Sequence, residues 1–172
     1  MSAHSPEASS AAASGVGGGL VTVGWREWVA FPSLGLPAVR CKVDTGAATS
    51  SLHATGIERF ARGGAPWARF AVRPFFRRHH AVRVVCEAPV ADERHVRSSS
   101  GHEDLRLVVA VTLRLGVRSD APEWPVLVTL ADRRAMQFPM LLGREAMKGR
   151  VLVDPGASFL LGRVEHASAL YA

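Results

Sequence analysis

The sequence predicts a single, mostly β domain with one short helix near its carboxyl end. The chain has 172 residues, which is enough for one hydrophobic core and too few for two. Of these residues 48% are apolar and 21% charged, a composition typical of globular proteins. Short segments rich in Val, Leu, Trp and Phe alternate with Gly and Pro, which is the pattern of strands and turns. Residues 143–148 carry Arg, Glu, Ala and Met without a β-branched residue, so we expect a helix there, ended by Gly149.

The predicted elements follow one another from residue 20 onward. Residues 1–19 are rich in Ala, Ser and Gly, and we expect a flexible tail there because no apolar pattern offsets the entropy cost of ordering it. The domain therefore spans 20–172. Its predicted strands are 20–28, 38–43, 67–72, 81–87, 106–115, 124–130, 150–153 and 158–161. Between the last two, Asp154-Pro155-Gly156-Ala157 is expected to form the turn of a terminal hairpin.

Cysteine use and the absence of long apolar runs predict a cytoplasmic protein. Cys41 and Cys86 supply neither a disulfide framework nor a set of zinc ligands, which favours a reducing compartment. Residues 1–19 lack the basic start and apolar run of a secretory signal. No segment approaches the roughly 20 apolar residues of a membrane helix.

The positive charge indicates an acidic partner only weakly. The net charge is +6, and its densest run, 69–83, alternates charged and apolar residues as the solvated face of a strand pair would. Steering of an acidic substrate is the alternative. Nucleic-acid binding is the weakest hypothesis, because few aromatic residues accompany the arginines as stacking platforms.

The most informative motif is Asp44-Thr45-Gly46, which follows the apolar residues of a predicted strand and precedes a run of small residues. A strand that delivers an aspartate to a tight turn places its carboxylate beside backbone amides that can bind its oxygens. The Thr45 hydroxyl can lock such a turn, and Gly46 allows another chain to approach closely. The simpler interpretation is that Asp44 only caps the turn.

A second motif lies most of a domain later, in Phe138-Pro139-Met140-Leu141-Leu142-Gly143-Arg144. Together with the first, it resembles the retropepsin pattern, in which a DTGA turn is followed by two apolar residues, Gly, often Arg, and a short helix. The resemblance implies a closed retropepsin-like β-barrel in which the later strand passes beneath the active-site turn. Leu141, Leu142, Gly143 and Arg144 would then support the site.

More narrowly, the chain is similar to a small bacterial family of retropepsin-like endopeptidases that also carries the name ATP-dependent zinc protease. The stretches that carry this resemblance are 24–29, 42–47 with Thr49, Ser50, Leu52 and His53, 124–126, 134–144 and 152–155. The family often has a basic residue directly after the DTGA turn, where this chain has Ala48. Its members can occur alongside ATP-grasp ligases that add glutamate to proteins, which implies a functional link to such a ligase and glutamate-extended substrates.

The resemblance implies an aspartic endopeptidase that works as a homodimer. Hydrolysis by carboxylates needs two of them sharing a proton, and this chain has one convincing Asp-Thr-Gly, so Asp44 from each of two subunits would hold the water. Ala47 and Thr49 are expected to contact the peptide. Ser100 and Gly101 in the segment 98–102 have the composition of a flap tip, or equally of an ordinary surface loop.

The sequence fits other arrangements less well. A zinc protease needs H-E-x-x-H, and His102-Glu103-Asp104-Leu105-Arg106 fails at its last position; the glycine-rich run 15–19 lacks the Lys and Ser or Thr of a phosphate loop. We therefore expect no metal and no cofactor. Val153-Asp154-Pro155-Gly156-Ala157 echoes the Asp44 segment, but proline replaces the hydroxyl residue and no apolar-apolar-Gly strand follows. A non-catalytic, retropepsin-shaped peptide-binding module stays open as an alternative.

Overall fold

The computed structural model describes residues 19–75, 82–97, 103–132 and 137–172, and in this part of the chain it is mostly β, as predicted. One α-helix and two 3-10 helices accompany eleven strands in these ranges. In chain order the elements are β1 (Val21–Gly24), β2 (Arg26–Phe31), η1 (Pro32–Leu34), β3 (Leu36–Asp44), β4 (Ser50–His53), β5 (Thr55–Arg62), β6 (Ala65–Val72), β7 (Val84–Arg97), β8 (Glu103–Leu115), β9 (Glu123–Ala131), β10 (Met140–Gly143), α1 (Arg144–Met147), β11 (Val151–Asp154) and η2 (Ala167–Tyr171).

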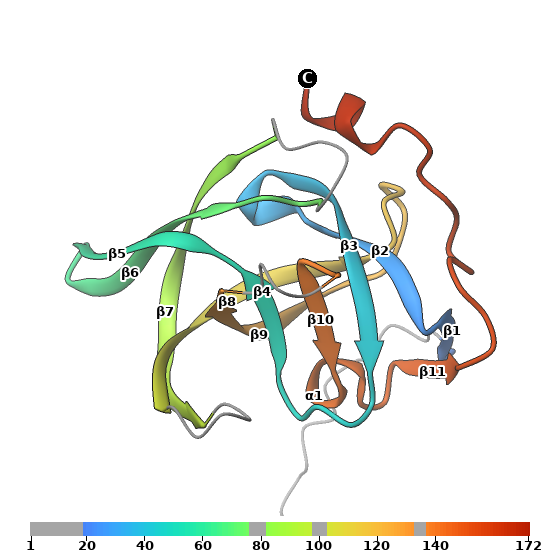
Figure 1. Cartoon of the computed structure of the whole chain (residues 1–172), viewed down its shortest axis with the longest axis horizontal. Helices are drawn as coiled ribbons and strands as arrows, with labels where there is room; N and C mark the ends of the chain where they lie inside the picture. Colours follow the sequence, from blue (N-terminus) through green and yellow to red (C-terminus); the bar gives the residue numbers. More distant parts are fainter. Residues whose placement is uncertain (1–18, 76–81, 98–102, 133–136) are drawn as a thin grey trace, which may run out of the picture.

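Nine of the described strands form one sheet that curls back on itself. Its order is β2-β3-β10-β4-β9-β8-β7-β6-β5, and β2 also pairs with β8, so the six strands from β2 to β8 in this order make a closed ring of pairings. The β5–β6 hairpin and part of β7 extend to one side of the ring (Figure 1). β1 and β11 form a separate two-stranded sheet near α1.

The inside of the ring is the hydrophobic core. Along β3, Val39, Cys41 and Val43 are buried while Arg40 and Lys42 are more exposed, because successive side chains of a strand point to opposite faces. Leu52 on β4 and Met140 on β10 are fully buried on the same inner side. The pairing of β3, β10 and β4 therefore fixes which residues face the core and which face outward.

The amino-terminal strand differs from its prediction. The segment 20–28 was expected to be one strand, but it divides at Trp25 into β1 and β2. β1 pairs in parallel with β11, whereas β2 pairs antiparallel with β3. The chain changes sheet at this point, and the Glu27 carboxylate, fully buried, accepts the backbone N–H of Gly24 at 2.8 Å.

The predicted terminal hairpin is wrong. β11 forms as expected, but 158–161 is not a strand, and β11 pairs with β1 instead. The N–H groups of Leu160 and Leu161 bind the Glu27 carboxylate at 2.8 and 3.3 Å, and Phe159 has a φ of 57°. Backbone donors that would make a strand ladder are thus used by one buried side chain.

Three of the described strands were not predicted from composition: β4, β5 and β10, the last of which was expected only from the motif resemblance. β4 consists of Ser50-Ser51-Leu52-His53 and is held between β10 and β9, while β5 is largely exposed and pairs with β6 at the edge of the described sheet. The predicted helix 143–148 is found one residue shorter at each end, and Gly149 follows it with a φ of 73°. None of the helices in the described ranges combines the length and apolarity needed to span a bilayer.

Candidate functional site

Asp44 is the last residue of β3, and its carboxylate is fixed by the turn that follows. One carboxylate oxygen, Oδ1, accepts the backbone N–H of Gly46 at 3.0 Å and of Ala47 at 3.2 Å. Asp44 is half-buried, whereas Thr45 and Gly46 are exposed. The second oxygen has no hydrogen bond among the described residues, so the turn orients the carboxylate and leaves one oxygen for another group.

β10 runs between the two strands that flank this turn. It pairs in parallel with β3, where Gly143 lies opposite Asp44, and antiparallel with β4, where Leu141 lies opposite Ser51. A Cβ on Gly143 would lie 2.5 Å from the carbonyl of Thr49. Glycine is therefore required here, because the backbone of the turn passes directly over it.

The start of α1 holds the far side of the turn. The N–H groups of Arg144 and Glu145 donate to the carbonyls of Ala47 at 2.9 Å and Ala48 at 3.1 Å. The Arg144 guanidinium also donates to the carbonyl of Gly46 at 3.1 Å. Both halves of the turn are thus fixed by the segment that follows β10.

Two hydroxyl groups beneath the turn were not predicted to be site residues, although Ser50 belongs to the stretches that carry the family resemblance. Ser50 Oγ accepts the N–H of Gly143 at 3.1 Å, and Thr129 on β9 donates to the carbonyl of Ser50 at 2.9 Å. Both residues are buried. Nothing in the local sequence marks them, since their importance comes from pairing between β4, β9 and β10.

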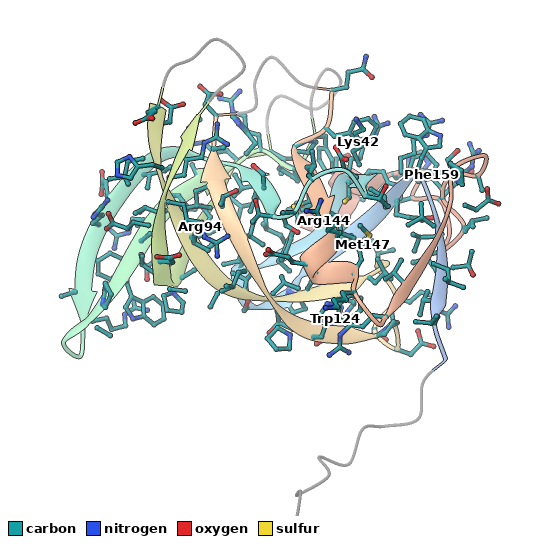
Figure 2. All side chains as sticks on the ribbon, turned by 90° about the horizontal axis from the view of Figure 1, so that it is seen from below. Lys42, Arg94, Trp124, Arg144, Met147 and Phe159 are labelled. Atoms are coloured by element: carbon teal, nitrogen blue, oxygen red, sulfur yellow. The ribbon has the colours of Figure 1, made fainter. Side chains whose placement is uncertain are left out.

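The outer face of the sheet continues from Asp44 along β3. Lys42 and Arg40 share this face with Asp44, because alternate residues of a strand point the same way. Arg26 on β2 and Leu141 on β10 both lie opposite Lys42. Figure 2 looks at the molecule from the end at which β3 and β10 terminate, and it labels Lys42 and Arg144 on this side.

A pocket of about 420 Å³ lies beside the turn. It is open to solvent and mixes apolar with charged residues, and Asp44 is not among the residues that line it. Its lining residues are Thr45, Arg144, Glu145, Met147, Lys148, Val151 and Val153.

A second turn repeats part of the hydrogen bonding of the first. Asp154 ends β11, its Oδ1 accepts the N–H of Gly156 at 2.9 Å, and Gly24 of β1 lies opposite it in a parallel pair. A Cβ on Gly24 would come within 2.6 Å of the Ser158 Cα. The N–H of Trp25 donates to the Ala157 carbonyl at 2.9 Å, as that of Arg144 does to Ala47. The approaching strand β1 precedes the turn in sequence, so the residues after Asp154 give no sign of it.

The structure brings most of the expected site residues together. Asp44, Thr45, Gly46, Ala47 and Thr49 form the turn, and Leu141, Leu142, Gly143 and Arg144 form the strand and helix start against it. Ser100 and Gly101 lie outside the described residues, although β7 and β8 remain paired as far as Arg97 and Glu103. In the ranges that the structure covers, no three His, Cys, Asp or Glu side chains are grouped to hold a metal ion.

A strand-end Asp-Thr-Gly turn with an apolar-apolar-Gly strand threaded against it defines a protein of the retropepsin-like class. The model of the RimB-like family, described as retropepsin-like aspartic endopeptidase RimB, matches residues 22–163. The chain belongs to this family.

Relatives and a solved structure extend the comparison. The chain is 47% identical over 154 residues to a probable alpha-L-glutamate ligase of Parasynechococcus marenigrum, and 44% identical over 140 residues to one of Shewanella pealeana. These matches cover 88% and 81% of this chain but only 32% and 30% of the relatives, so the chain spans about a third of their length. The crystal structure of Lpg0085 from Legionella pneumophila, a protein of unknown function, matches with a TM-score of 0.66 and 26% identity, covering 82% of this chain and 98% of that one.

Proposed function

We propose that the chain is an aspartic endopeptidase that hydrolyses peptide bonds through a water molecule held between two Asp44 carboxylates of a homodimer. The observation that carries this proposal is the fixed Asp44 carboxylate, bound on one oxygen by Gly46 and Ala47 and open on the other. Family membership supports the reaction class.

The chemistry requires a second carboxylate. Two carboxylates about 3 Å apart cannot both ionise cheaply, so one keeps a proton for the carbonyl oxygen while the other takes a proton from water. Each subunit offers one Asp44 turn, which connects β3 to β4 at one end of the ring of strands (Figure 1). A two-fold axis would bring two such turns together. Thr45, Gly46, Ala47 and Thr49 would line the peptide path, and Leu141, Leu142, Gly143 and Arg144 would support the turn.

The proposed domain is residues 20–172, preceded by a tail, and its ring of paired strands would correspond to the closed barrel of the retropepsin fold. The segment with Ser100 and Gly101, at the end of the long β7–β8 hairpin, would serve as the flap. The substrate is a peptide or protein tail, and a glutamate-extended one agrees with the net charge of +6 and with the ligase names of the relatives. The site of action would be the cytoplasm.

The test is peptide cleavage by purified protein and by Asp44→Asn. The wild type should cleave and elute as a dimer, whereas Asp44→Asn should lose at least a thousandfold in kcat/KM and still form the dimer, since Asn keeps the size and one oxygen. A monomer that cleaves would overturn the homodimer site.

The alternatives give different results in the same experiment. A non-catalytic peptide-binding module would bind but never cleave. A zinc protease would lose activity with a chelator and keep it in Asp44→Asn.

A further inference from the structure

Three cations lie on one outer face of β2 and β3, beside the Asp44 turn. Lys42 and Arg40 precede Asp44 by two and four residues on the same face of β3, and Arg26 lies opposite Lys42 in the antiparallel β2–β3 pair. We call Arg26, Arg40 and Lys42 the basic track.

The basic track lacks counter-charges within the described part of the chain. Several other arginines there are paired with carboxylates, as Arg69 is with Glu87 at 2.8 Å. Among the described residues, none of the three track side chains takes part in an ion pair or a hydrogen bond. Arg26 Nε is buried without a partner. The pKa of Arg40 is lowered, first by burial and then by the charge of Arg26. Holding these cations together without an anion costs free energy.

Aromatic rings fix the two guanidinium groups from their flat sides. The Arg26 guanidinium carbon lies 4.7 Å from the Trp25 ring centre and 5.0 Å from that of Phe159, and Arg40 lies 5.2 Å from Phe138. Trp25 and Phe138 contact each other edge to face at 5.9 Å. Such stacking occupies the faces of a guanidinium and leaves the N–H groups at its edge free to donate.

A purely covering role for these arginines does not account for the arrangement. Long side chains often lie over apolar rings while their charged ends stay in water. Here one guanidinium nitrogen is buried without a partner, and two guanidinium groups lie near enough to affect each other's charge. An anionic ligand bound to the other guanidinium nitrogens would offset the charges of these two groups.

We propose that the basic track is a subsite that binds the carboxylates of an acidic peptide lying over Asp44, and that Arg26, Arg40 and Lys42 determine this specificity. That the ligand is a peptide rests on the proposed function. Alternate side chains of a strand are about 6.8 Å apart, so Lys42 and Arg40 match carboxylates at every second position of an extended peptide, while the Arg26 fork can bind one carboxylate with two hydrogen bonds.

Binding, measured without cleavage, tests this subsite. In the Asp44→Asn background, fluorescence anisotropy would compare a labelled octapeptide of alternating Glu and Ser with its Gln and Ser counterpart. We expect the Glu peptide to bind at least tenfold more tightly, and Arg26→Gln, Arg40→Gln and Lys42→Met each to weaken it by about tenfold. Circular dichroism checks folding, and Lys42 is exposed, so its variant stays informative if an arginine variant unfolds.

The matched control is Arg150→Gln, which removes the same charge from an arginine over the Trp124 ring, outside the site. It should change the affinity less than twofold. Equal binding of the Glu and Gln peptides, equal effects of track and control variants, or tighter binding of an octauridylate through the same three residues would each overturn the subsite. Absence of cleavage by the wild type would instead overturn the peptidase and leave this binding result standing.

Discussion

Gly143 lies directly opposite Asp44, in a parallel pair so close to the turn that a side chain on Gly143 has no room. Its Cβ would lie 2.5 Å from the Thr49 carbonyl and 2.9 Å from the Ala48 oxygen. These atoms belong to the backbone and cannot rotate away. The position of the Asp44 carboxylate therefore depends on a glycine nearly a hundred residues later.

Gly143→Ala should displace the turn. We expect a loss of about 3 kcal/mol in the free energy of unfolding from the overpacking. A carboxylate shifted by about 1 Å should cost on the order of a hundredfold in kcat. Urea unfolding and peptide cleavage measure the two effects.

Two glycine variants serve as controls for Gly143→Ala. Gly24→Ala makes a comparable clash at the Asp154 turn and should lower stability with little loss of kcat. Gly19→Ala meets no atom within 4 Å and should change neither. Equal kcat in Gly143→Ala and Gly24→Ala would contradict the link between Gly143 and the carboxylate.

Ser50→Ala and Ser51→Ala should differ although the residues are neighbours. Ser50 Oγ binds the N–H of Gly143, and its loss leaves a buried donor unpaired, at about 1–3 kcal/mol. Ser51 Oγ is buried without a partner, so Ser51→Ala should be neutral or stabilising. Thermal and urea unfolding of both variants measure this difference. A larger loss of stability in Ser51→Ala than in Ser50→Ala would contradict the assignment of the supporting hydroxyl to Ser50.

The strands that could be predicted are those whose own sequence alternates. β6, β8 and β9 carry enough apolar residues to show the pattern, and the structure has strands close to their expected bounds. β4, with two serines in four residues, is a strand because β9 and β10 supply its hydrogen bonds. The intrinsic strand propensity of a segment does not reveal which neighbouring strands will supply its hydrogen bonds.

The terminal hairpin also shows that local sequence does not reveal which segments a strand pairs with. The turn chemistry of Asp154 was recognised, and the Gly156 N–H does bind its carboxylate. The partner strand was wrong, because Glu27, more than a hundred residues earlier, takes the N–H groups of Leu160 and Leu161. At the site, Asp44 and 141–144 were expected from motif resemblance, whereas Ser50, Thr129 and the basic track depend on distances between strands.

Cys86 should make the protein less stable in alkali. Burial raises the pKa of its thiol to about 12, above the ordinary value of 9.0. The folded state therefore keeps a proton that the unfolded state loses above pH 9, so this contribution is complete below about pH 9 and falls as the pH rises toward 12. Urea unfolding of the wild type and Cys86→Ala at pH 8 and 10.5 measures it. The wild type should lose more stability between these values than the variant, and equal losses would contradict the buried thiol.

Asp154→Asn should leave peptide cleavage unchanged, in contrast to Asp44→Asn. Both carboxylates accept a glycine N–H in similar turns, and an asparagine oxygen can keep that bond, so neither change should lower stability by more than about 1 kcal/mol. The difference lies in the surroundings: Asp44 adjoins the basic track and α1, whereas Asp154 is exposed at the end of the small β1–β11 sheet. Cleavage rates of the two single variants and the double variant measure this. If Asp154→Asn alone abolished cleavage, both carboxylates would belong to one chain, because removing either member of a proton-sharing couple stops the reaction, and the homodimer would have no catalytic role.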